Sequence, residues 1–125
     1  MQILIFGDDK STLRWVKSQL IKCSHCYITT AAGIDETMVL LKSLHFDAII
    51  FDISFSGIKV KEIIRELLYI RGNIALIILT APETLPGAVE AVKMGAETYL
   101  VKDKAAPGLL AESLSAVCSK KPRFS

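Results

Sequence analysis

Short apolar runs alternate along the chain with longer segments in which apolar residues recur at helical spacing. The run at 74–79 contains only Ile, Leu and Ala, and the run at 47–53 is apolar apart from two acids, as in strands covered on both faces. We expect strands at 2–6, 27–32, 47–53, 74–79 and 98–101, and helices at 11–22, 35–44, 58–70, through Ala88 to Met94, and from Pro107 through Val117. Because strand and helix alternate five times without a long connection, the pattern predicts a three-layer α/β sandwich with a parallel sheet between helices.

Size and composition fit one globular domain. The chain has 125 residues, of which 51% are hydrophobic and 22% charged, a balance that excludes intrinsic disorder and collagen-like repeats. We expect one domain over residues 1–119, followed at 120–125 by a polar tail or the start of a linker. The run at 74–79 is too short to cross a bilayer and no signal peptide is visible, so we expect no membrane contact. A net charge of +2 is too small to indicate direct nucleic-acid binding by this domain.

Polar side chains gather where the predicted strands end. Asp8 and Asp9 follow the first strand, Asp52 lies at the third, Thr80 follows the fourth and Lys102 follows the fifth. In sheets of this kind ligands bind beyond the carboxyl ends of the strands. Two carboxylates about 4 Å apart repel by roughly 4 kcal/mol at an effective dielectric constant near 20, and one lysine offsets only one charge. A divalent ion with oxygen ligands, most plausibly Mg²⁺, would neutralise the rest.

These residues stand in segments that resemble the signatures of a known family. The segments are Asp8-Asp9 with Arg14 shortly after, the strand at 48–52 that ends in Asp52, the step Leu79-Thr80-Ala81, and the run 95–102 that ends in Lys102. In this order and spacing they resemble the response regulator receiver domain, the phosphoacceptor half of two-component signalling, over essentially the whole chain. The resemblance implies a flavodoxin-like, doubly wound fold: a five-stranded parallel sheet of order 2-1-3-4-5 with five helices.

The resemblance also implies a role for each matched residue. Asp52 would be the phosphoacceptor, whose carboxylate attacks the phosphorus of a phosphohistidine on a sensor histidine kinase or phosphotransfer protein. Asp9 would bind Mg²⁺ directly, Asp8 mainly through metal-bound water, and Ser54 through its backbone carbonyl. Mg²⁺ would offset the repulsion between the attacking carboxylate and the phosphoryl oxygens. Such a domain catalyses only its own phosphorylation and dephosphorylation and is not an enzyme for other substrates.

A second group of residues is implied in switching. Thr80 and Lys102 would bind phosphoryl oxygens, and Tyr99 would turn inward as Thr80 moves, changing the surface of the fourth helix, fifth strand and fifth helix. That surface would control an output and is a possible homodimer interface. The step from Lys102 to Asp103 is similar to regulators with a helix-turn-helix module, so a DNA-binding output domain outside this chain is a possible partner.

Two departures from the family pattern leave alternatives open. Phe55-Ser56-Gly57 stands where the family usually has Met-Pro and then Gly, and Asp103 replaces a common Pro whose preceding bond is often cis. One alternative is a degenerate receiver that binds a partner without phosphorylation. Another is a small phosphohydrolase of the haloacid dehalogenase type, but that mechanism needs a second aspartate at the position of Ser54.

The cysteines allow a separate set of interpretations. Three cysteines do not make an even disulfide framework, which favours a reducing compartment and therefore a cytoplasmic location. Cys23 and Cys26 have the spacing of a redox pair or of half a zinc site. The pair follows a helix instead of opening one, and the chain has no second Cys or His pair to complete four zinc ligands. We therefore favour turn and packing roles for both residues.

Overall fold

The computed structural model describes residues 1–7, 9–23, 25–54, 59–70 and 73–120. The strands are β1 (Gln2–Phe6), β2 (Tyr27–Ala31), β3 (Ala48–Asp52), β4 (Ala75–Thr80) and β5 (Thr98–Val101). The α-helices are α1 (Lys10–Gln19), α2 (Ile34–Ser43), α3 (Val60–Ile70), α4 (Leu85–Met94) and α5 (Leu109–Lys120). Two short 3₁₀ helices, η1 (Pro82–Thr84) and η2 (Lys102–Lys104), follow β4 and β5.

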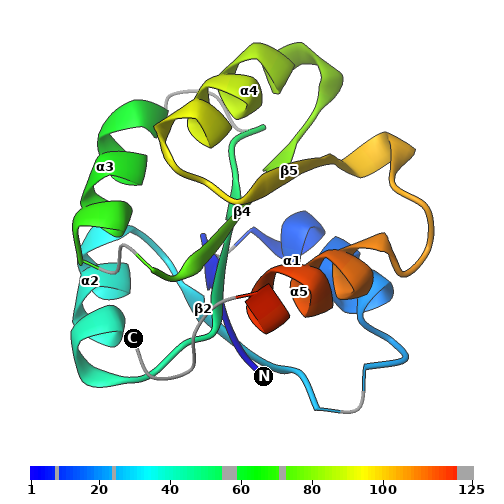
Figure 1. Cartoon of the computed structure of the whole chain (residues 1–125), viewed down its shortest axis with the longest axis horizontal. Helices are drawn as coiled ribbons and strands as arrows, with labels where there is room; N and C mark the ends of the chain where they lie inside the picture. Colours follow the sequence, from blue (N-terminus) through cyan, green and yellow to red (C-terminus); the bar gives the residue numbers. More distant parts are fainter. Residues whose placement is uncertain (8, 24, 55–58, 71–72, 121–125) are drawn as a thin grey trace.

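All five strands form one parallel sheet in the order β2-β1-β3-β4-β5, which confirms the predicted doubly wound topology. α1 and α5 cover one face of the sheet, and α2, α3 and α4 cover the other (Figure 1). The strand order reverses between β1 and β3, and ligands of open α/β sheets bind beyond the strand ends at such a point. Asp9 follows β1 and Asp52 ends β3, so the topology brings both acids to this edge.

The two central strands explain why their sequences read as continuous apolar runs. Every residue of β3 and β4 is buried, because helices pack on both faces. Alternate residues enter different cores: Ile49 and Phe51 join the cluster under α2, α3 and α4, whereas Ala48 and Ile50 join the cluster under α1 and α5. The ring of Phe51 also packs at 4.8 Å, between centroids, against Phe6 on β1. The end of β3 is therefore held from three sides.

Most observed boundaries differ from the predicted ones by one to three residues, and the differences in α1 and β4 affect how the site is described. α1 ends at Gln19 with Leu20 as its C-cap, although apolar spacing extended the helix to residue 22. Leu20 is buried, so the spacing identified a residue that faces the core, but burial does not require a helical backbone. β4 is displaced by one residue toward the C-terminus, so that Thr80 is its last residue and pairs with Val101. The backbone of Thr80 is therefore fixed by the sheet.

The Gln19 side chain joins the end of α1 to the start of α5. Its Nε2 donates to the backbone carbonyl of Ala106 at 3.2 Å, and its Oε1 accepts from the backbone N–H of Leu110 at 3.0 Å. That N–H lies in the first turn of α5, where helical N–H groups have no partner within the helix. Gln19 is itself buried. α1 and α5 are therefore linked by polar bonds in addition to apolar packing.

The segment between α1 and β2 contains a correction to the sequence analysis. Cys23 and Cys26 are joined by a disulfide bond, with their Cα atoms 5.8 Å apart. Both residues also pack against the cluster under α1 and α5, so the expected packing role is present but incomplete. The chain turns back here between helix and strand, which brings residues three positions apart within disulfide range. The argument for a reducing compartment from unpaired cysteines therefore loses its support.

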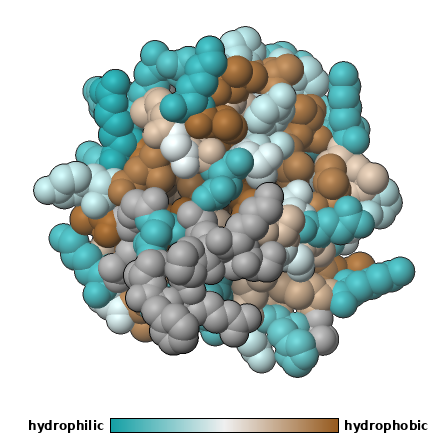
Figure 2. Space-filling model, viewed as in Figure 1, coloured by the Kyte–Doolittle hydropathy of each residue, from teal (hydrophilic) through white to brown (hydrophobic). Residues whose placement is uncertain are grey.

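The surface drawn in Figure 2 mixes hydrophobic and hydrophilic side chains, with hydrophilic ones projecting at the periphery. Among the large apolar side chains that the structure describes, Ile21 and Tyr69 are the most exposed, at 82% and 89%. In the described part of the chain, no helix has both the length and the apolar character needed to span a membrane.

Candidate functional site

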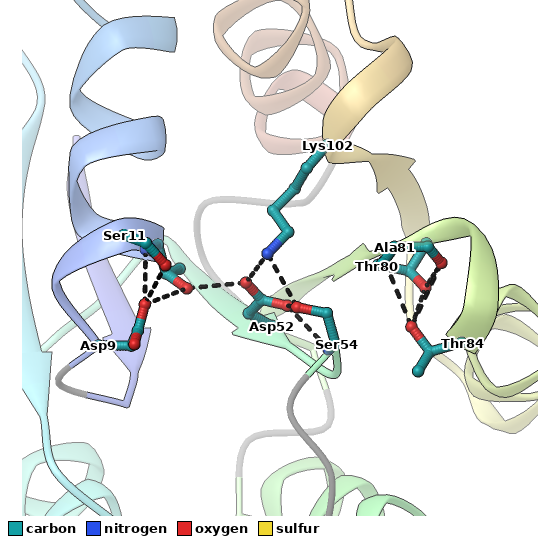
Figure 3. Close-up of polar contacts among 9 residues, drawn as sticks. Asp9, Ser11, Asp52, Ser54, Thr80, Ala81, Thr84 and Lys102 are labelled. Atoms are coloured by element: carbon teal, nitrogen blue, oxygen red, sulfur yellow. Dashed lines mark hydrogen bonds and ion pairs between the residues drawn. The ribbon is translucent and has the colours of Figure 1, made fainter.

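The carboxylate of Asp52 is the centre of the polar contacts at the carboxyl edge of the sheet (Figure 3). Its side chain is only 2% exposed, and four donors surround it. Oδ2 accepts from the Thr12 hydroxyl at 2.7 Å and from Lys102 Nζ at 2.6 Å. Oδ1 accepts from the backbone N–H of Ser54 at 2.9 Å and from the Ser54 hydroxyl at 2.5 Å. A buried carboxylate requires such partners, because desolvation would otherwise make its charge very unfavourable.

Lys102 reaches Asp52 from the end of β5, which is two strands away from β3 in the sheet. It is the first residue of η2, directly after β5, and its side chain is 17% exposed. Nζ also donates to the Ser54 hydroxyl at 2.8 Å, so the ammonium group bridges two neighbouring side chains. The peptide bond between Lys102 and Asp103 is trans, which answers the question raised by the missing proline. The lysine reaches Asp52 without a cis bond at this step.

Asp9 has a structural role in addition to its position near Asp52. It is the N-cap of α1, and its carboxylate accepts from the backbone N–H of Thr12 at 3.0 Å and from the Ser11 hydroxyl. The bond from the Ser11 hydroxyl, followed by that from the Thr12 N–H, holds the pKa of Asp9 below its ordinary value of 3.8. Asp9 therefore caps α1, and the Ser11 hydroxyl is one of its donors.

Thr12 links the two acids and was not identified from the sequence. Its hydroxyl lies 2.7 Å from Oδ2 of Asp52 and 3.5 Å from Oδ2 of Asp9, so these carboxylate oxygens are no farther apart than the sum of the two distances. Thr12 is buried, at 3% exposed. The sequence did not identify it because the helix was predicted from the spacing of apolar residues alone. The available signal was its position three residues after an acidic N-cap, where the first turn of the helix returns to the cap.

Thr80 and Tyr99 lie on β4 and β5, and among the described residues neither forms a hydrogen bond with Asp52. The Thr80 hydroxyl donates to the carbonyl of its neighbour Ala81 at 2.8 Å and lies 2.7 Å from the hydroxyl of Thr84. Figure 3 shows Thr80, Ala81 and Thr84 as a group separate from Asp52 and Lys102. Tyr99 is half-buried and packs against the cluster under α2, α3 and α4. Thr84 is another residue that the sequence analysis did not single out.

Part of the expected site lies outside the described residues. Asp8, expected as a metal ligand, and Phe55-Ser56-Gly57, expected to shape the adjoining loop, both fall there. Within the described residues, no group of three or more His, Cys, Asp or Glu side chains is placed to hold a metal ion. Of the expected metal ligands, Asp9, Asp52 and Ser54 are described at this edge. Carboxylate and carbonyl oxygens are the donor types that suit Mg²⁺.

Comparisons with known proteins agree with this architecture. The family model of the response regulator receiver domain matches residues 3–113. The chain is 30% identical over 95 residues to the DNA-binding transcriptional regulator NtrC of Salmonella typhimurium, covering 76% of this chain and 20% of that protein. It therefore spans about a fifth of the length of this curated relative.

Similar solved structures include a response regulator receiver domain protein from Clostridium thermocellum. It superposes with a TM-score of 0.78 at 26% identity, over 95% of this chain and 94% of that one. The receiver domain of the sensor histidine kinase PA1611 from Pseudomonas aeruginosa PAO1 has a TM-score of 0.76 at 20% identity, over 95% of this chain and 98% of that one. That neighbour has a magnesium ion coordinated in its active site cleft. Because the family model covers most of the sequence and the strand order agrees with it, this chain belongs to the response regulator receiver domain family.

Proposed function

We propose that the chain is a phosphorylation-controlled signalling domain in which Asp52 accepts a phosphoryl group from a sensor histidine kinase or a phosphotransfer protein. The observation that carries the proposal is the buried carboxylate of Asp52, held 2.6 Å from Lys102 at the carboxyl edge of the sheet. The proposed domain spans residues 1–119, with 120–125 as a tail or the start of a linker. We also propose a cytoplasmic location, which rests on membership of the receiver domain family and no longer on the cysteine count.

In the proposed reaction an oxygen of Asp52 attacks phosphorus and the bond from phosphorus to the histidine nitrogen breaks, which leaves an aspartyl phosphate. An attacking oxygen must first give up a hydrogen bond, because both oxygens of Asp52 accept two. Oδ1 is bonded only by Ser54, whereas Oδ2 is bonded by Thr12 and Lys102. Lys102 has three N–H donors, so it can bind a phosphoryl oxygen while it continues to orient the carboxylate.

The donor set supports a requirement for Mg²⁺. We assign Asp9, Asp52 and the Ser54 carbonyl as ligands, together with Asp8 from outside the described residues. When bound, the ion would offset the negative charge that builds up between the carboxylate and the phosphoryl oxygens. The hydrogen bonds that Asp9 accepts from Ser11 and Thr12 go to its Oδ2, so Oδ1 is the oxygen that would hold the ion. The magnesium ion in the cleft of the Pseudomonas neighbour is consistent with this assignment.

The proposed switch begins at Thr80. Its hydroxyl would leave the Ala81 carbonyl and donate to a phosphoryl oxygen, while Tyr99 turns inward from the neighbouring strand. A hydrogen bond to a charged group contributes about 1.5 to 3 kcal/mol, whereas inverting a 1:99 equilibrium requires about 5.5 kcal/mol. Lys102 already binds Asp52, so the Thr80 bond is the principal new contact and the shift in population is partial.

The changed surface is proposed to be that of α4, β5 and α5, which would control an output and can serve as a homodimer interface. The relative from Salmonella typhimurium is named as a DNA-binding transcriptional regulator and is much longer than this chain. That relationship supports a DNA-binding output domain outside this sequence as a partner.

Small phosphodonors provide the direct test. Incubation with acetyl phosphate and Mg²⁺ is expected to add the mass of one phosphoryl group, and Asp52→Asn to abolish the gain. Asp35→Asn, at an exposed acid on α2, is the matched control and should be labelled like the wild type. The proposal fails if the intact protein gains no phosphoryl group, or if Asp52→Asn is labelled to the same extent as the control.

One observation favours the alternative of a phosphorylation-independent interaction module. Four donors already satisfy Asp52, so the buried carboxylate is accommodated by the protein's own groups. Titration with Mg²⁺, followed by the fluorescence of Trp15, separates the two functions. Saturable binding that Asp9→Ala removes supports the phosphoacceptor, and the absence of saturable binding supports the module.

A further inference from the structure

The Cys23–Cys26 disulfide lies in a part of the molecule that phosphorylation does not use. Cys26 directly precedes Tyr27, the first residue of β2, so the bond lies at the amino edge of the parallel sheet. Asp52 ends β3 at the opposite, carboxyl edge. An inference about the cysteine pair therefore stands independently of the function proposed for Asp52.

The disulfide joins two residues that are partly exposed to solvent. Cys23 and Cys26 are both half-buried: they pack on the cluster under α1 and α5, and part of each remains exposed. Their described neighbours are exposed, with Ile21 at 82% and Tyr27 at 58% of full accessibility. Lys22 and His25 are exposed as well. We therefore expect a small thiol to reach the disulfide without prior unfolding of the domain.

The fold on either side does not depend on the bond. β2 is paired with β1 through five residue pairs, from Gln2 with Tyr27 to Phe6 with Ala31. α1 is docked by buried Val16 and by the hydrogen bonds from Gln19 to the backbone around the start of α5. A disulfide stabilises mainly by restricting the unfolded chain, and this effect is smallest when the closed loop is short. The Cys23–Cys26 ring spans three residue steps, so its loss leaves the larger contacts intact.

A metal site does not account for the pair. The sulfurs are bonded to each other, and a thiolate ligand would have to be released first. Among the residues that the structure describes, none of the His, Cys, Asp and Glu side chains form a group of three or more suited to a metal ion. The chemistry that remains for two accessible, bonded sulfurs is thiol–disulfide exchange.

We propose that Cys23 and Cys26 form a reversible two-electron redox site that exchanges with dithiols. A thiolate of the dithiol attacks one sulfur of the pair, forms a mixed disulfide and releases the other sulfur as a thiolate, which takes up a proton. The second thiol of the donor then attacks its own sulfur in the mixed disulfide, releasing the remaining cysteine. Two electrons and two protons pass to the protein, which ends with two thiols while the donor ends with a disulfide.

Thiol counting in the native protein tests the proposal. The protein is purified without reductant, incubated with or without dithiothreitol in native buffer, and then denatured in acid and labelled with a maleimide. Of the three cysteines in the chain, only Cys118 is expected to be labelled before reduction and all three after it. The gain of two labels should map to Cys23 and Cys26, and should reverse when dithiothreitol is replaced by oxidised glutathione. Circular dichroism should be unchanged throughout.

Cysteine variants show which cysteines form the bond and whether the bond is needed for the fold. Cys118→Ser should shift the counts from one and three to none and two, which excludes a disulfide formed through Cys118, and non-reducing electrophoresis should show a monomer. Cys26→Ser should give two labels under both conditions. The proposal is overturned if three labels appear in native protein after oxidised glutathione, because no bond has formed. It is equally overturned if the two additional labels appear only when dithiothreitol is added in denaturant, or if reduction in native buffer abolishes the circular dichroism signal. Either result would mean that the bond is structural.

Discussion

The hydroxyl oxygens of Thr80 and Thr84 lie 2.7 Å apart at the carboxyl end of β4. Thr80 has one hydroxyl proton, and when it donates that proton to the Ala81 carbonyl at 2.8 Å, Thr84 is the donor in the bond between the two hydroxyls. In the proposed switch Thr80 turns away to bind a phosphoryl oxygen, and the Ala81 carbonyl would lose that donor. The Thr84 hydroxyl is 3.3 Å from that carbonyl and can replace it.

Thr84→Val is expected to favour the phosphorylated conformation. The substitution removes the donor that holds Thr80 in its present position, whereas the half-buried Ala81 carbonyl can bind water instead. Loss of a neutral hydrogen bond of about 0.5 to 1.5 kcal/mol predicts about a two- to tenfold higher affinity for beryllium fluoride, which mimics an aspartyl phosphate. Thr84→Ser keeps the hydroxyl and should bind like the wild type. Equal affinities for the Val and Ser variants would contradict this role of Thr84.

Lys102→Ala is expected to destabilise the domain strongly. Removing the ammonium group leaves the Asp52 carboxylate buried without its counter-charge, and breaking one side of a buried pair costs about 3–5 kcal/mol. Urea unfolding measures the change, with Lys104→Ala at an exposed position of η2 as the control. The double variant Lys102→Ala with Asp52→Asn should recover part of the loss, because it leaves no buried charge. If Lys102→Ala lowers the free energy of unfolding by the same amount in the wild type and in the Asp52→Asn variant, the cause is not electrostatic.

Thr12→Val tests the link between α1 and Asp52. The variant keeps the shape of the side chain but loses the bond from Thr12 Oγ1 to Asp52 Oδ2. A hydrogen bond to a charged acceptor contributes about 1.5 to 3 kcal/mol, and that is the decrease expected in the free energy of unfolding. Thr12→Ser, which retains the hydroxyl, should lose much less. If the two variants are equally unstable, packing of the methyl group and not the hydrogen bond is the cause.

Asp9 predicts how stability depends on pH. Its folded-state pKa lies below the ordinary value of 3.8, so near and below that value the unfolded chain binds more protons than the folded one. The stabilisation from Asp9 is therefore complete above about pH 4 and is lost as the pH falls through the lowered pKa. In Asp9→Asn, which can still cap α1, thermal melts between pH 3 and pH 5 should vary less with pH than in the wild type. An unchanged slope would show that other carboxylates dominate the acid response.

The sequence was sufficient for the fold and for the edge at which the site lies. Continuous apolar runs at β3 and β4 identified strands covered on both faces, and parallel strands necessarily place their carboxyl ends together. The contact between Asp52 and Lys102 follows from that arrangement, although 50 positions separate the two residues.

Other parts of the site depend on information that residue spacing does not contain. Thr12 and Thr84 contact Asp52 and Thr80 through particular side-chain rotamers, whereas periodicity reports only which face of a helix is buried. The disulfide was missed for a related reason: it depends on how tightly the chain turns between α1 and β2.

Asp9 and Asp52 lie at one edge of the sheet and the Cys23–Cys26 disulfide lies at the other, which has a consequence for regulation of the domain. The central strands and the helices beside them separate the two edges by their full length, and no described contact joins the chemistry of one to the other. With both proposals, phosphorylation at one edge and thiol–disulfide exchange at the other would give the domain four distinct covalent states, and a partner that contacts both edges could distinguish them.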